Sequence, residues 1–67
     1  MGMKDTDIIE LVRDAPRSET AMRSLISIAH STNSHRTDTI LNTYKGSSMS
    51  IGELARALGL MILEVSE

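Results

Sequence analysis

The chain has 67 residues, a formal net charge of -2 and a pI near 5.6. This length suits one domain, which we place over residues 1–67 with residues 1–4 as a disordered or cloning-derived start. The absence of cysteine excludes disulfides and thiolate metal sites. Because the net charge is negative, the chain also lacks the excess of basic residues that drives general nucleic-acid binding.

The first two predicted elements are amphipathic helices separated by a proline. Within residues 5–15 the apolar side chains follow the i, i+3, i+4, i+7 spacing of a helix with one buried face. Pro16 ends this helix, because the residue before a proline is disfavoured in the helical region. The same spacing recurs in a second helix that starts near Ser18 and fades in the polar segment 31–34. The two apolar stripes comprise Ile8, Leu11, Val12 and Ala15, then Met22, Leu25, Ile26 and Ala29.

Two further helical segments are predicted in the second half of the chain. Thr37 or Asp38 is expected to cap a short segment with apolar residues within 40–44, and this segment ends at Gly46. The last element opens with the capping box Ser50–Glu53. Because no stretch alternates with period two, the sequence predicts an all-α fold, a small bundle of three to four short helices.

The size of the chain favours an oligomer. A domain this short buries only about 60% of its unfolded surface. Small scaffolds are usually stabilised by a metal, by disulfides or by a partner. Because the sequence offers neither cysteine nor an evident metal site, we expect homodimerisation to complete the bundle.

Residues near the C-terminus have the sizes and conformational freedom that two steeply crossing helices require. Ala55 is small where the two backbones would approach, and Gly59 permits a tight turn with positive φ. The wedge between the helices would be filled by Leu54, Leu58, Leu60 and Val65. On these residues, the segment 51–66 resembles the helix-turn-helix of the phage repressor and Cro family. The resemblance implies a dimeric repressor that binds operator DNA.

The segment departs from that family where the second helix would meet DNA. Family members commonly carry polar residues there, whereas this chain has apolar residues at 61–63 and then Glu64 and Glu67, which repel phosphate. The same residues also fit one continuous amphipathic helix from Ser50 to the end, with Gly59 inside it and two apolar sides to bury. The sequence leaves both alternatives open.

Both alternatives predict an exposed apolar surface near the C-terminus. The rest of so short a chain is not expected to bury four consecutive large apolar side chains, and such a patch is typical of a protein interface. The expected interface residues are Leu60, Met61, Ile62 and Leu63. We therefore expect a small non-enzymatic helical regulator that self-associates and modulates another regulator by protein–protein contact.

The alternative function is that of a dimeric helix-turn-helix repressor. It would require the element around Val65 to enter a groove of the DNA, or a patch of arginines to do so instead. The possible nucleic-acid contacts are Arg13, Arg17, Arg23 and Arg56, of which the first three flank the turn between the first two helices. The alternative is that these arginines lie on a solvent-exposed face and pair with acidic neighbours on the same helices.

No catalytic, cofactor or metal site is predicted. His30, His35 and Asp38 are poorly spaced for metal ligands on one helix face. Neither a phosphate-binding loop nor a nucleophile elbow occurs, and no cleft is expected, so we do not expect an enzyme. The polar start and the short apolar runs predict neither a secretion signal nor a membrane span, and the expected location is the cytoplasm.

Overall fold

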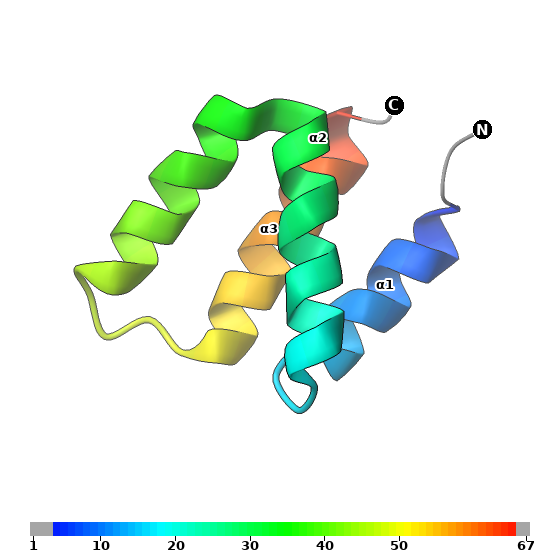
Figure 1. Ribbon diagram of the computed structural model, residues 1–67, viewed down its shortest axis with the longest axis horizontal. Helices are drawn as coiled ribbons and strands as arrows, with labels where there is room; N and C mark the ends of the chain where they lie inside the picture. Colours follow the sequence, from blue (N-terminus) through cyan, green and yellow to red (C-terminus); the bar gives the residue numbers. More distant parts are fainter. Residues whose placement is uncertain (1–3, 66–67) are drawn as a thin grey trace.

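The computed structural model describes residues 4–65, which form three helices (Figure 1). Helix α1 spans Asp5–Asp14, α2 spans Glu19–Lys45 and α3 spans Ile51–Val65. The described residues contain no strand, so the predicted all-α fold is confirmed. Helix α2 joins the second and third predicted segments into one kinked element. Within residues 4–65, no helix has the length and apolar character needed to cross a membrane.

The start of the first helix is held by a local cap. Lys4 is extended, and its backbone amide donates to the Asp7 carboxylate at 3.2 Å. The carboxylates of Asp5 and Asp7 also favour the positive end of the helix dipole. Lys4 is therefore the N-cap of α1, although the sequence placed it in a disordered or cloning-derived start. The other residues of that start, 1–3, lie outside the described residues.

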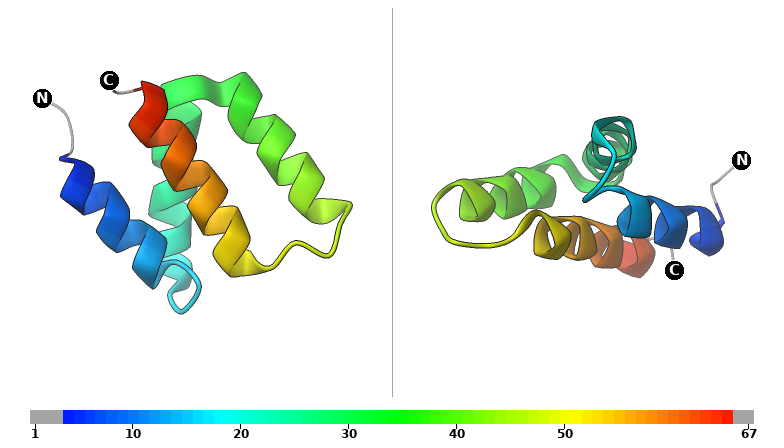
Figure 2. Two further views of the ribbon diagram at one scale, coloured as in Figure 1. Left: turned by 180° about the vertical axis from the view of Figure 1, so that it is seen from behind. Right: turned by 90° about the horizontal axis from the view of Figure 1, so that it is seen from below.

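The helices form a flat molecule with one covered and one uncovered broad face. Asn33 divides α2 into a first arm, residues 19–32, and a second arm, residues 34–45. The second arm, α3 and α1 lie side by side in a row, and the first arm crosses one face of that row (Figure 2). The Cα atoms span 35 × 25 × 16 Å. The opposite face of the row is covered by no other element of residues 4–65.

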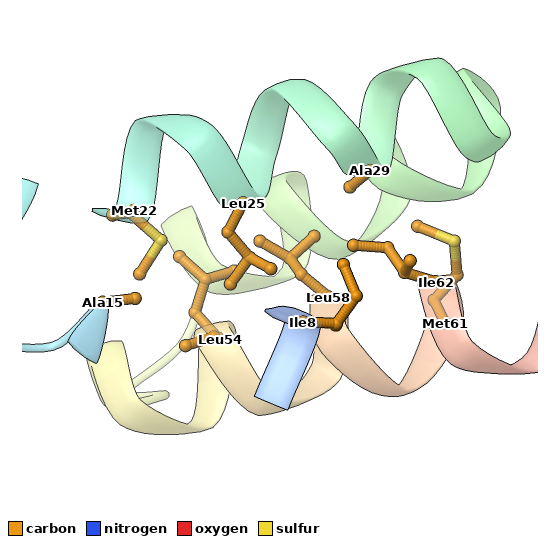
Figure 3. Close-up of a cluster of buried hydrophobic side chains, with 10 residues drawn as sticks. Ile8, Ala15, Met22, Leu25, Ala29, Leu54, Leu58, Met61 and Ile62 are labelled. Carbon is orange, nitrogen blue, oxygen red and sulfur yellow. The ribbon is translucent and has the colours of Figure 1, made fainter. Parts of the chain in front are cut away.

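The hydrophobic core lies between the row and the first arm of α2. Figure 3 shows Met22, Leu25 and Ala29 of that arm facing side chains of α1 and α3. The buried apolar residues are Ile8, Ala15, Met22, Leu25, Ala29, Leu54, Ala55, Leu58, Met61 and Ile62. The stripe predicted for the second helix therefore supplies one side of this core, and the stripe predicted for the first helix supplies the other side together with α3.

The kink in α2 is a helix cap placed inside a helix. Asn33 has extended dihedrals (φ -159, ψ 94), and its side-chain Oδ1 accepts the backbone N–H of Arg36 at 3.0 Å. Thr37, which is fully buried, donates its hydroxyl to the Asn33 carbonyl at 2.8 Å. The prediction that Thr37 or Asp38 caps this segment is wrong, because the break occupies one residue, four positions earlier than Thr37.

Asn33→Ala is expected to lower the free energy of unfolding by about 0.5–2 kcal/mol, the usual cost of losing an N-cap. Asn33→Asp is the matched control, because a carboxylate oxygen can accept the same amide hydrogen and should preserve most of the stability. Urea unfolding followed by circular dichroism measures both variants. Equal stability of the alanine variant and the wild type would show that the cap does not hold the kink.

Gly59 lies inside a continuous helix and lets two helices come close together. No residue of 4–65 has a positive φ, so the turn that the helix-turn-helix alternative places at Gly59 is absent and the continuous-helix alternative describes α3. A Cβ atom at Gly59 would overlap the Cγ2 methyl of Val12 and would lie 3.9 Å from Cγ2 of Ile8. The lack of a side chain at Gly59 is therefore a requirement of the packing of α1 on α3.

Gly59→Ala is expected to lower the free energy of unfolding by about 1–2 kcal/mol, because overpacking a tight contact outweighs the better helix propensity of alanine. The control is Gly52→Ala in the same helix, where the nearest neighbours of a Cβ lie at 3.9 and 4.0 Å. That change should stabilise the protein by up to about 1 kcal/mol.

A second substitution ties the effect to one contact. Val12→Ala removes the methyl group that a Cβ at Gly59 would overlap. In that background Gly59→Ala should cost less than in the wild type, and urea unfolding of the four proteins gives the coupling energy. Strictly additive costs would show that α1 and α3 do not meet at these two residues.

Candidate functional site

The four residues predicted as an interface lie on different sides of α3. Consecutive helical residues are turned by about 100°, so a run of four cannot form one surface. Met61 and Ile62 are only 1% and 4% exposed, because they pack into the core beneath the first arm of α2 (Figure 3). The prediction that they are exposed is wrong. Leu60 is 54% exposed, and Leu63 is half-buried against the edge of the core.

Helix α1 contributes a second exposed apolar residue beside Leu60. Ile9 is 56% exposed, and it lines a groove of about 120 Å³ together with Leu60, Val12 and Leu63. Gly59 and Arg56 also line this groove. We call the four apolar side chains Ile9, Val12, Leu60 and Leu63 the α1–α3 patch.

The position of the patch follows from the close packing at Gly59. Because α1 can approach α3 there, Ile9 and Leu60 lie on the same side of the molecule. Leu60 lies opposite to the buried Ala55 and Ile62 around α3, so it points away from the first arm of α2. The patch therefore belongs to the uncovered broad face that Figure 2 shows in its left view.

Sequence reasoning missed Ile9 as a site residue. Ile9 lies about 100° around the helix from Ile8, outside the stripe that packs into the core. An apolar residue beside the buried stripe of a short helix was the available signal. Ile9 matters because α1 lies next to Leu60 of α3. A contact between two helices cannot be predicted from the spacing of residues within one of them.

The four arginines of the alternative site are not gathered into one surface. Arg13 lies 3.5 Å from Asp14, and Arg23 lies 3.5 Å from Glu19. Arg23 lines a hollow between α1 and α2, whereas Arg56 lines the groove between α1 and α3, on the other side of α1. Arg17 is exposed in the turn after α1.

The hollow between α1 and α2 is open, and most of its charged side chains are acidic. It measures about 680 Å³, and its charged lining consists of Asp7, Glu10 and Asp14 with Arg23 opposite them. Within residues 4–65, no group of three or more His, Cys, Asp or Glu side chains has the geometry to hold a metal ion. The hollow thus has a charged lining but no group of metal ligands among the described residues.

The polar residues at the kink form a local network. His30 lies 3.4 Å from the Ser34 hydroxyl through Nδ1 and 3.8 Å from the Asp38 carboxylate through Nε2. These contacts link the two arms of α2 across Asn33. His35 is exposed and takes no part in them.

One ion pair joins α3 to the second arm of α2. The Arg36 guanidinium lies 3.1 Å from the Glu64 carboxylate, which brings the beginning of that arm to the end of α3. Both side chains are more than half exposed, so the pair contributes little to stability, about 0–1 kcal/mol. Glu64 also lies four residues after Leu60, at the border of the α1–α3 patch.

No protein-family model, curated protein or solved structure matches the chain.

Proposed function

We propose that this protein is a non-enzymatic regulator that works by protein–protein contact through the α1–α3 patch, that it self-associates there, and that it modulates another regulator. The observation that carries the proposal is the exposure of Ile9 and Leu60, each more than half open to solvent, on a broad face that no other described element covers. Large apolar side chains that are exposed together are typical of protein interfaces.

The energetics of the patch support contact with another chain. Full burial of one such side chain contributes about 1.5–3 kcal/mol, so covering the exposed halves of Ile9 and Leu60 would contribute about 1 kcal/mol each. A standard interface takes about 800 Å² from each partner. A face of 35 by 25 Å between outer Cα atoms is large enough to supply that area.

The shape of the groove supports a side-chain contact and not a small-molecule site. Its volume of about 120 Å³ lies below the roughly 300–1,000 Å³ of typical ligand pockets. Its lining is apolar apart from Arg56, and it holds no pair of groups suited to acid–base or nucleophilic chemistry. One inserted apolar side chain would fill such a groove.

Leu60→Ser and Ile9→Ser are each expected to weaken self-association by about 10- to 100-fold, because each removes about 1 kcal/mol per copy from a surface that both copies share. Analytical ultracentrifugation over a range of protein concentrations measures the change. Helical circular dichroism should stay close to that of the wild type, since both side chains are exposed.

The matched control is Ile51→Ser. Ile51 is also an apolar residue of α3 and is 43% exposed, but it does not line the groove. It should leave the sedimentation behaviour unchanged. A wild-type chain that sediments as a monomer at every concentration, or equal effects of Ile51→Ser and Leu60→Ser, would remove the proposal.

The competing function is binding of operator DNA. One feature favours DNA binding: Arg56 lies on the face that also carries the patch, where it could contact a phosphate. Glu53 and Glu64 are exposed on the same helix, however, and they oppose contact with phosphate. A gel-shift assay at 50 and 200 mM salt is expected to show no complex. A complex that weakens steeply with salt would favour DNA binding instead, because phosphate contacts release counterions.

A further inference from the structure

We propose that the α1–α3 patch is occupied by a second copy of this chain, related by a twofold axis through the patch, so that the acidic end of each copy meets the basic end of the other. This inference rests on the proposed function and adds the identity and orientation of the partner. It is carried by the charges around the patch, by the antiparallel course of α1 and α3, and by the symmetry that follows from both.

Each exposed apolar residue of the patch has an acidic and a basic neighbour on its own helix. Ile9 has Asp5 four residues before it and Arg13 four residues after it. Residues four apart lie on the same side of a helix, so these charges border Ile9. Leu60 has the reverse order, with Arg56 four residues before it and Glu64 four residues after it. All four charged residues are exposed.

The reversed order matters because α1 and α3 run in opposite directions. A Cβ at Gly59 would meet Val12, and a Cβ at Gly52 would meet Pro16, so higher numbers in α1 lie beside lower numbers in α3. Figure 2 shows this antiparallel course in its left view. The patch therefore has a basic end and an acidic end. The basic end carries Arg13 and Arg56, and the acidic end carries Asp5 and Glu64.

These charges are open to a partner. Within residues 4–65, neither Asp5 nor Arg56 forms an ion pair. Arg13 and Glu64 have one each, with Asp14 and Arg36, but both side chains are mostly exposed and keep further hydrogen-bonding capacity. The other acid near the basic end, Glu53, is turned to its own helix start, with Oε1 3.4 Å from the Ser50 hydroxyl.

A surface with this charge order is complementary to itself. Twofold rotation about its centre places each acidic end on a basic end, twice, while the apolar centres meet one another. The parallel arrangement would place like charges together at both ends, which is unfavourable. Each patch brings two acids, Asp5 and Glu64, and two bases, Arg13 and Arg56, to this pairing. A partner of different sequence would have to carry the same pattern.

The test reverses one end of the patch at a time. The double variant Arg13→Glu, Arg56→Glu makes both ends acidic, and the double variant Asp5→Lys, Glu64→Lys makes both ends basic. The dimer dissociation constant of each variant is expected to be at least tenfold higher than that of the wild type, because like charges then meet at both ends. An equimolar mixture of the two variants should recover dimers, all of them mixed. Ultracentrifugation and native mass spectrometry at low salt measure both results.

Two control variants keep the test independent of folding. Asp5→Lys alone leaves the Arg36–Glu64 pair intact and should weaken the dimer in the same direction. Glu19→Lys with Arg23→Glu exchanges an exposed ion pair on α2, away from the patch, and should change nothing. Circular dichroism confirms that each variant folds.

The possible outcomes separate this inference from the proposed function. Charge-reversed variants that dimerise like the wild type, or a mixture that forms no mixed dimer, would overturn the twofold arrangement. If Leu60→Ser still disrupted association in that case, the proposed use of the patch would stand. A wild-type dimer that is insensitive to Leu60→Ser, or a wild-type monomer, would overturn the proposed function as well.

Discussion

The close contact between Gly59 of α3 and Val12 of α1 determines the shape of this protein. Val12 is β-branched and therefore stiff in a helix, so its methyl group cannot easily move away from a neighbouring backbone. A residue without a side chain at position 59 is what allows the two helices to meet. Because they meet, α1 extends the row formed by α3 and the second arm of α2. A wider separation would open the groove beneath Ile9 and Leu60 and divide the patch.

The flatness of the molecule follows from how little chain is available to build a second layer. Only the first arm of α2 crosses the row, and it buries the core residues of α1 and α3 on one face. The other face has no such cover. Its central helix, α3, carries charged residues at 53, 56 and 64 around Leu60, the most exposed large apolar residue of that helix. That composition is polar enough for contact with water and still provides an apolar centre for contact with another chain.

The local elements could be predicted from the sequence, whereas the contacts between them could not. The 3.6-residue period identified the stripes of Ile8 and Leu25, because the apolar residues of a helix that packs on one side must recur once per turn. The same reasoning failed at Asn33, where a one-residue cap bends the chain without separating two helices by a loop. It also failed for Met61 and Ile62, because a run of apolar residues in a helix faces several directions at once. The role of Gly59 depends on Val12, which lies 47 positions earlier in the chain.

Affinity and orientation come from different parts of the proposed interface. Exposed ion pairs contribute about 0–1 kcal/mol, so the charges at the two ends mainly exclude the wrong alignment. Most of the attraction then has to come from Ile9, Leu60 and the groove between them, a small apolar area for a permanent dimer. Such an interface would exchange partners readily. For the proposed function this exchange matters, because it would make the apolar centre available again after each self-association.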